Sequence, residues 1–210
     1  MVGATGSGKT TTLASMIDHR NERVSGHILT IEDPIEYLFR NKKSIVNQRE
    51  VGSDTQTLQV GLRNALRQAP DVILIGEIRD RETMSAAIAY AQSGHLCLAT
   101  LHASNSYQAL NRGLNFFPVE VRPTLLSDLA TGLKAIVSQR LLRTTVGQRV
   151  PAVEVLLNTH LIAQLIEKGD FAGIQDAMEK SMAEGCQTFE QDIAKLINDG
   201  VVDKKEGMAY

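Results

Sequence analysis

A phosphate-binding pattern, G-x-x-x-x-G-K-[ST], occupies residues 3–10 of the chain. Its glycines let the backbone wrap a polyphosphate so that successive N–H groups point inward. Lys9 brings a positive charge to the β- and γ-phosphates, and the Thr10 hydroxyl can bind Mg²⁺. Residues 11–17 fit a helix whose positive dipole end faces the phosphates. The pattern therefore predicts binding of ATP with Mg²⁺ through consecutive residues, which are Gly3, Ala4, Thr5, Gly6, Ser7, Gly8, Lys9, Thr10 and Thr11.

An apolar run at 72–75, followed by Gly76 and Glu77, predicts a buried strand that ends in an acidic residue. In an enzyme with a phosphate-binding loop, such a strand delivers a carboxylate to Mg²⁺ or to its water shell. Glu77 is therefore the second predicted metal-binding residue beside Thr10, either directly or through a water molecule.

Three acidic residues, Glu32, Asp33 and Glu36, follow another apolar run at 27–31. Pro34 fixes the local turn and can hold the carboxylates at one edge of a sheet. One carboxylate beside the γ-phosphate could orient the attacking water, because phosphoryl transfer depends on positioning and electrostatics. The residues alone do not choose among the three acids, and a solvated acidic turn is the alternative interpretation.

Two histidines flank a third apolar run at 96–101. His102 follows the run, where it can contact the γ-phosphate or relay its loss to a neighbouring loop. The alternative is a core histidine satisfied by hydrogen bonds. His95 precedes the run and carries a weaker form of the same argument. Because open parallel α/β sheets bind ligands at the carboxyl ends of their strands, we expect one of the three acids, Glu77 and His102 to converge there.

The order of apolar and amphipathic segments predicts an α/β fold with helices on the faces of a mainly parallel sheet. The expected strands lie at 27–31, 72–75, 96–101 and 153–157. The expected helices lie at 57–68, 82–92 and 104–114, and residues 121–142 also have a largely helical pattern. After residue 158 the expected elements are helices at 161–168, 174–184 and 189–198. We therefore expect a core domain of residues 1–157 and a C-terminal helical subdomain of residues 158–210.

The composition is that of a globular protein, since 43% of the 210 residues are hydrophobic and 22% are charged. A net charge of −2 and an aromatic content of 4% argue against a nucleic-acid partner. No apolar run approaches the roughly 18–20 residues that span a bilayer, and no signal peptide is visible.

Two cysteines, Cys97 and Cys186, make neither a disulfide framework nor a four-ligand zinc site. Cys97 lies inside an apolar run and is expected to be a buried thiol in a reducing compartment. These features predict a cytoplasmic protein without zinc.

The phosphate-binding pattern and three further motifs resemble, in their order along the chain, those of the secretion ATPases, the motors of type II secretion and type IV pili. Segment 66–80 is similar to the family signature, 31–36 to its Asp box, and 100–105 with His95 to its His box. The resemblance covers nearly the whole chain and implies a RecA-like P-loop core. By position, Glu36 matches the water-activating glutamate, Glu77 the Walker B acid, and His95 and His102 the paired histidines.

Within this family, the pilus-retraction ATPases of the PilT/PilU group are the most similar. Extension ATPases usually carry a four-cysteine zinc site, for which this chain has too few cysteines. Segments 47–52, 66–71 and 182–189 resemble the retraction ATPases. Segment 161–169 departs from the Ala-Ile-Arg-rich helix of PilT and is similar to PilU.

The resemblance implies a homo-hexamer that hydrolyses ATP at its subunit interfaces and drives retraction and twitching motility. It also implies association with a paralogous retraction ATPase, and action on an inner-membrane pilus platform protein from the cytoplasmic side. Only two residues precede Gly3, so we expect a fragment that lacks the family's N-terminal PAS-like domain. In the family, basic residues of that domain complete the neighbouring site. Arg79, Arg81 and Arg112 are the internal candidates for this role, and salt bridges at the surface or at an interface are the favoured alternative for them.

Two other functions stay open at this point. A RecA-like nucleic-acid motor shares the loop and the sheet, although a basic, aromatic strand-binding groove would favour it. A non-catalytic nucleotide-binding or assembly module would use the loop without turnover.

Overall fold

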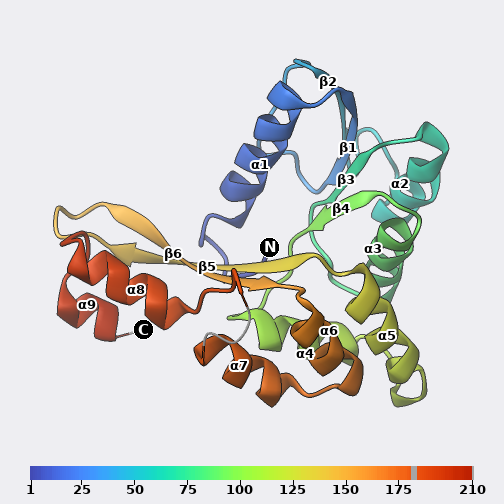
Figure 1. Ribbon diagram of the computed structural model, residues 1–210. Coiled ribbons are helices and arrows are strands. Elements are labelled where there is room, and N and C mark those ends of the chain that lie inside the picture. Colours follow the sequence, from blue (N-terminus) through green and yellow to red (C-terminus); the bar gives the residue numbers. More distant parts are fainter. Residues whose placement is uncertain (181–183, 210) are drawn as a thin grey trace. The chain divides into compact units, whose positions relative to one another are not determined.

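The computed structural model describes residues 1–180 and 184–209, which form an α/β protein with a mainly parallel sheet (Figure 1). The chain divides into two compact units. Unit 1 comprises Met1–Lys9 and His102–Tyr210, and unit 2 comprises Thr10–Leu101. The chain thus passes from one unit to the other inside two of the predicted motifs. The boundary predicted at 157/158 stays a prediction.

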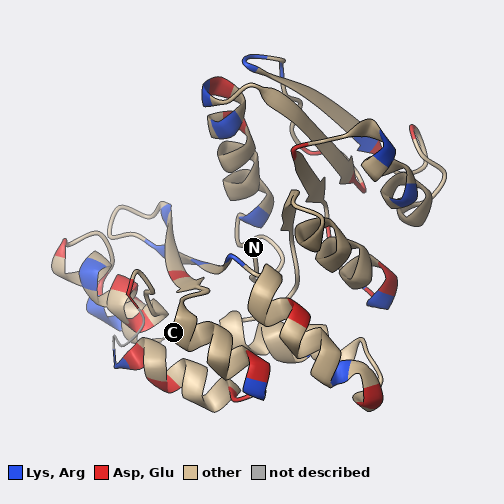
Figure 2. Ribbon diagram, turned by 45° about the vertical axis from the view of Figure 1, so that its right-hand side comes forward, with Lys and Arg blue, Asp and Glu red and all other residues tan. Residues whose placement is uncertain are grey.

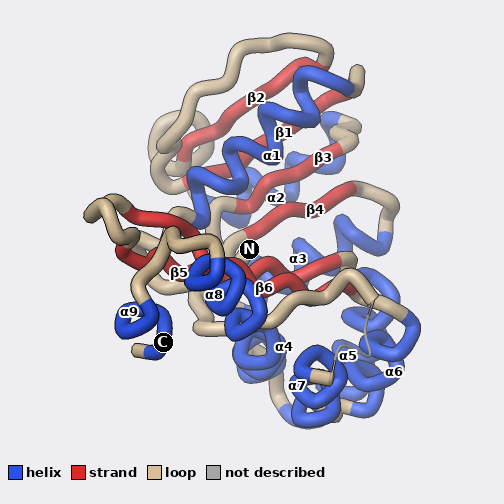
Figure 3. The backbone as a smooth tube through the Cα atoms, turned by 60° about the vertical axis from the view of Figure 1, so that its left-hand side comes forward, coloured by secondary structure: helices blue, strands red, loops and turns tan. Residues whose placement is uncertain are grey.

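Unit 2 contains a four-stranded sheet in which all neighbouring strands are parallel (Figure 3). Its strands, in spatial order, are β2 (Ser44–Glu50), β1 (Gly26–Glu32), β3 (Val72–Ile75) and β4 (Leu96–Ala99). The register pairs Ile31 with Ile75, and Ile75 with Ala99, so three strands end at one edge. The strands predicted near 27–31, 72–75 and 96–101 are confirmed.

Helices cover both faces of this sheet (Figures 1 and 3). One face carries α1 (Lys9–Arg23), whereas α2 (Leu58–Ala65), the 3₁₀ turn η1 (Leu66–Gln68) and α3 (Arg81–Gln92) lie on the other. Thr57 caps α2, and Asp80 forms a capping box with Thr83 at the start of α3. Each cap satisfies backbone donors that the first helical turn leaves unpaired, which fixes where the helix begins.

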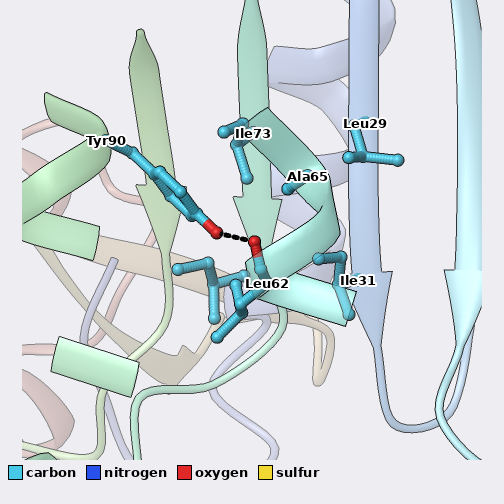
Figure 4. Close-up of a cluster of buried hydrophobic side chains, with 7 residues drawn as sticks. Leu29, Ile31, Leu62, Ala65, Ile73 and Tyr90 are labelled. Carbon is cyan, nitrogen blue, oxygen red and sulfur yellow. Dashed lines mark hydrogen bonds between the residues drawn. The ribbon is translucent and has the colours of Figure 1, made fainter. Parts of the chain in front are cut away.

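The face of the sheet beneath α2 and α3 holds a buried apolar cluster (Figure 4). Its members are Leu29, Ile31, Leu62, Ala65, Ile73, Ile75 and Tyr90. Each large side chain buried there stabilises the fold by about 1.5–3 kcal/mol. The Tyr90 hydroxyl donates to the Leu62 carbonyl and so ties α3 to α2. Burial raises the pKa of Tyr90 to about 12, which keeps this donor protonated.

Unit 1 is built on an antiparallel pair, β5 (Ala135–Arg143) and β6 (Arg149–Leu157). Val2 pairs in parallel with β5 at Ser138, so the residue before the phosphate-binding pattern is anchored to this strand. The helices of unit 1 are α4 (Ser106–Asn115), α5 (Arg122–Gly132), α6 (His160–Lys168), α7 (Phe171–Glu179), α8 (Phe189–Asn198) and α9 (Lys204–Met208). A 3₁₀ turn, η2 (Val119–Val121), precedes α5.

Three expectations about the elements need correction. The helical pattern of 121–142 is wrong in its second half, because α5 ends at Gly132, Leu133 is extended and β5 follows. Strand 153–157 belongs to the antiparallel pair and not to the parallel sheet. Strand β2 was missed, because its mostly polar sequence becomes a strand only through parallel pairing with β1.

Two of the helices expected after residue 158 are confirmed, those at 161–168 and 189–198. The one expected at 174–184 corresponds to α7, and residues 181–183 lie outside the described residues.

Charged side chains lie mainly on helices, helix ends and loops, and the strands of unit 2 are largely uncharged (Figure 2). Cys97 on β4 packs against the buried cluster, and burial raises the pKa of its thiol to about 12. Within residues 1–180 and 184–209, no helix has both the length and the apolar character needed to cross a membrane.

Candidate functional site

The phosphate-binding pattern folds as a loop that leads directly into α1. Gly6 and Gly8 have φ values of 76° and 87°, in the left-handed region that favours glycine. The side-chain ammonium of Lys9 donates to the carbonyl oxygens of Gly3 and Ala4, each at 2.9 Å. The loop therefore places a cation and the N-terminus of a 15-residue helix together, which is an arrangement that binds anions.

Ser7 supports this interpretation through an unsatisfied polar atom. Only 6% of the residue is exposed, and its hydroxyl finds no hydrogen-bond partner among the described residues. Buried polar groups are nearly always paired, so an unpaired hydroxyl beside a helix N-terminus fits a ligand that supplies oxygen atoms.

Gln139 on β5 forms hydrogen bonds with the loop and with the residue before it. Its side-chain amide donates to the Ser7 carbonyl at 2.6 Å, and its backbone N–H donates to the Val2 carbonyl at 3.0 Å. A side chain at Gly3 would bring its Cβ to 2.5 Å from the Gln139 carbonyl oxygen. Gln139 was not predicted, because no local pattern links residues 132 positions apart.

The predicted His102 lies beside the loop in unit 1. A cavity of about 440 Å³ is lined by Gly3, Ala4 and His102, and also by polar residues of α4 that include Arg112. Arg112 is exposed and makes no hydrogen bond or ion pair within the part of the chain that the structure describes. The structure thus brings His102 to the start of the loop.

A buried carboxylate fixes the segment that follows His102. Glu154 of β6 is 8% exposed, and its Oε1 accepts hydrogen bonds from the backbone N–H and hydroxyl of Ser106 at 2.7 and 2.5 Å. The Ser138 hydroxyl donates to the same oxygen at 2.9 Å. Ser106 begins α4, and Ser138 lies on β5. Glu154 therefore holds the start of α4 against β5, the strand with which Val2 pairs.

In unit 2, three strand ends meet at one edge of the sheet. The Gly76 N–H donates to the Ile31 carbonyl at 2.9 Å, the Thr100 hydroxyl donates to the Gly76 carbonyl at 2.5 Å, and the Ile78 N–H donates to the Thr100 carbonyl at 2.9 Å. The residues that follow β1, β3 and β4 are therefore neighbours. This is the edge at which an open parallel sheet binds its ligands.

Glu32 is the most buried of the acids at this edge, with 6% of the residue exposed. It lines a cavity of about 20 Å³ together with Thr10, Gly76 and Thr100. Burial raises the pKa of Glu32, although hydrogen bonds from Thr30 and Gln48 oppose the shift. Thr10 and Glu32 thus line the same small cavity, and hydroxyl and carboxylate oxygens are ligands that suit a hard cation.

Glu77 and the acidic turn after β1 are linked by one arginine. Arg79 forms an ion pair with Glu77 at 2.6 Å and a longer one with Asp33 at 3.6 Å. Hydrogen bonding to Glu77 raises the pKa of Arg79 above its ordinary value. The structure therefore brings Glu77 and Asp33 together, and Arg79 partly balances their negative charge.

Glu36 lies in the exposed loop that follows the acidic turn. The hydroxyl of the next residue, Tyr37, hydrogen-bonds with the Thr11 hydroxyl at 2.9 Å. The loop that carries Glu36 is thereby held against the first turn of α1. No side-chain contact fixes the carboxylate of Glu36 within the described residues.

His95 occupies the opposite end of β4 from Thr100. Its Nδ1 lies 3.0 Å from the Ser93 hydroxyl, and its ring meets that of Tyr90 edge-on with centroids 6.4 Å apart. At about 3.3 Å per residue, a four-residue strand separates His95 from Thr100 by more than about 13 Å. The structure does not bring His95 to Glu77, and its predicted role stays a prediction.

The mainly parallel sheet of unit 2 is flanked by helices, and the glycine-rich loop leads into α1, so the chain is an α/β protein with a glycine-rich loop before a helix. A family model described as "Type II/IV secretion system protein" matches residues 1–195, and the chain belongs to this family.

Among its relatives, the chain is 51% identical over 210 residues to the Pseudomonas aeruginosa "Type IV pilus ATPase PilU", covering all of this chain and 55% of that protein. It is 40% identical over 205 residues to PilT of the same organism, a "Type IV pilus retractation ATPase", covering 98% of this chain and 60% of PilT. The chain thus spans between half and two thirds of these relatives.

A solved structure gives the same result for the fold. The crystal structure of the pilus retraction motor PilT with bound ADP superposes with a TM-score of 0.92 at 44% identity, covering 99% of this chain and 59% of PilT. The expected α/β fold and the resemblance to the PilT/PilU group are confirmed.

Proposed function

We propose that this chain is the ATP-hydrolysing part of a type IV pilus retraction motor of the PilU kind. The observation that carries the proposal is the 51% identity to a pilus ATPase over the whole chain, together with a loop built to bind an anion. Departure from the PilT helix pattern at 161–169 favours the accessory PilU role over that of PilT.

The phosphate-binding loop supplies nucleotide affinity. Its backbone N–H groups and Lys9 receive the β- and γ-phosphates, and the nine residues from Gly3 to Thr11 form the binding segment. Thr10 and Glu77 are the proposed Mg²⁺ ligands, with Glu32 close to Thr10. A bound magnesium ion would neutralise charge that develops on the phosphates.

Hydrolysis needs a residue that takes a proton from the attacking water. We assign this role to Glu36, whose loop is held near the start of α1 by Tyr37. His102 lies beside Gly3 and Ala4, where it reports the presence of the terminal phosphate to α4. His95 is the second histidine of the proposed pair, and it lies at the opposite end of β4 from Thr100.

The proposed assembly is a homo-hexamer on the cytoplasmic side of the inner membrane. It acts on the pilus platform protein and associates with a paralogous retraction ATPase, without zinc or nucleic acid. Cations from a neighbouring subunit complete each site, and such a cation contributes about 10³–10⁵ in rate in related phosphoryl transfer. We therefore expect the 210-residue chain alone to bind nucleotide and to turn it over slowly.

Nucleotide binding is tested with a fluorescent ATP analogue and Mg²⁺. Lys9→Ala should weaken binding at least about tenfold, because the cation that faces the phosphates is lost. Lys42→Ala is the matched control, since the exposed ammonium of Lys42 forms ion pairs with Asp18 and Glu22 of α1. Equal affinity of Lys9→Ala and the unmodified chain would overturn the assignment of the loop.

The motor role is tested in a chimera. This chain replaces the matching region of Pseudomonas aeruginosa PilU, and pilus-driven surface movement is measured. Movement that depends on Lys9 supports the proposal. A chimera that hydrolyses ATP and assembles yet supports no movement contradicts the pilus assignment while leaving the ATPase assignment intact.

A further inference from the structure

The contacts of Gln139 concentrate on the phosphate-binding loop. Gln139 is 4% exposed on β5, and its backbone and side chain reach opposite ends of the same short segment. The backbone N–H holds Val2 at the entrance of the loop, and the side-chain amide holds the Ser7 carbonyl near its end. A Cβ on Gly8 would lie 2.7 Å from Nε2 of Gln139, so this amide packs directly against the loop.

The hydrogen bond to Ser7 fixes the direction of the next N–H group. In a trans peptide the carbonyl and the following N–H point in opposite directions. Because Gln139 holds the Ser7 carbonyl on the β5 side, the N–H of Gly8 points away from β5. A phosphate in the loop needs N–H groups that point into its concave side, so this bond selects the peptide orientation that binds it.

The neighbouring residue on β5 serves a different contact. Ser138 donates to Glu154, away from the loop, because successive side chains on a strand point to opposite faces. Gln139 therefore acts on the loop, whereas Ser138 acts on the start of α4.

We propose that Gln139 is a positioning residue that orients the Ser7–Gly8 peptide for phosphate binding. This rests on the proposed function, since it concerns the same loop. Gln139 does not touch the nucleotide. It acts by holding the loop in one orientation before the nucleotide arrives, which lowers the ordering cost of binding.

The first test replaces the donor without changing the size of the side chain. Gln139→Leu and Gln139→Met should each bind the fluorescent ATP analogue about tenfold more weakly, which corresponds to the loss of one hydrogen bond. Gln187→Leu is the matched control, because Gln187 also donates its side-chain amide to a backbone carbonyl of unit 1, that of Val153 at 2.8 Å. Its affinity for the analogue should equal that of the unmodified chain.

The second test uses the pH dependence of Gln139→Glu. An ionised carboxylate cannot donate to the Ser7 carbonyl, whereas a protonated one can. Affinity relative to the unmodified chain should therefore be lowest near pH 8 and recover toward pH 5.5, with no such recovery in Gln139→Leu. A purely structural role predicts no difference between these two pH profiles.

The outcomes separate this inference from the proposed function. If neither the unmodified chain nor Lys9→Ala binds the analogue, the proposed function fails. If the unmodified chain binds, Lys9→Ala does not, and all Gln139 variants bind normally, only the positioning role is overturned. Urea denaturation of each variant identifies any that are unfolded, and the Gln139→Glu profile then carries the decision.

Discussion

The backbone N–H of Gly76 donates to the carbonyl of Ile31 at 2.9 Å, and this bond joins the ends of β3 and β1. Glu77 and Glu32 are the residues that follow these two positions. Two acidic segments that lie 45 positions apart in the sequence thereby become neighbours at one edge of the unit 2 sheet.

Gly76→Ala should disturb both acidic segments at once. A Cβ at this position would lie 3.3 Å from Cα of Glu32 and 3.3 Å from the Ile31 carbonyl oxygen, and both are backbone atoms. Overpacking of this kind costs about 1–3 kcal/mol of the free energy of unfolding. Urea denaturation should show this loss, and ATP turnover should fall more than nucleotide affinity. An unchanged unfolding midpoint would contradict the close packing of the two strand ends.

Glu36→Gln should keep nucleotide affinity and lose about 10²–10⁴ in turnover, because an amide cannot accept the proton of the attacking water. The measurement compares phosphate release with binding of the fluorescent analogue in the full motor. Glu22→Gln is the control, since Glu22 is an exposed acid on α1 that pairs with Lys42. If Glu32→Gln stops hydrolysis while Glu36→Gln does not, the proton acceptor is Glu32.

Glu32 should make stability depend on pH. Its pKa is raised above the ordinary value near 4.5, chiefly by burial. The folded state therefore holds this proton more tightly than the unfolded chain does, so the Glu32 contribution to the free energy of unfolding falls as pH rises from about 4.5 through the raised pKa. Urea denaturation at several pH values should show this fall in the unmodified chain. The fall should be reduced in Glu32→Gln, and identical profiles would contradict the shift.

Glu154→Leu should lower the free energy of unfolding by about 2–4 kcal/mol, because the donors of Ser106 and Ser138 lose their buried acceptor. Glu154→Gln should cost less, since its amide oxygen can still accept. Urea denaturation measures both, with the exposed Glu190→Leu as the control. Equal losses in Glu154→Leu and Glu190→Leu would show that the buried network does not stabilise unit 1.

Sequence patterns predicted the loop and the main strands well because their signals are local. The glycines and Lys9 of the loop lie within eight consecutive residues, and their chemistry follows from spacing alone. The uninterrupted apolar run at β3 is typical of a strand buried on both faces, and all four of its residues are buried. Helices α3 and α8 were predicted for the same reason, since their helical patterns lie within the segments themselves.

Strands β2 and β5 were not predicted because pairing decides them. Residues 44–50 are largely polar, and they become extended only because β1 offers a row of backbone partners. Residues 135–143 have a leucine-rich pattern that also suits a helix, but β6 and Val2 pair with them instead.

The sequence by itself determined which residues can do chemistry, namely the loop, the acidic turn, Glu77 and the histidines. Only the tertiary structure decided which of them meet: Glu77 with Asp33, Thr10 with Glu32, and His102 with Gly3 and Ala4, with His95 at the other end of its strand. It also revealed Gln139 and Glu154, since hydrogen bonds between distant segments leave no periodic signal in the chain. The spacing of residues along the chain determines which side chains can do chemistry together in one motif. Strand register and the packing of helix ends determine which of these motifs lie close to one another.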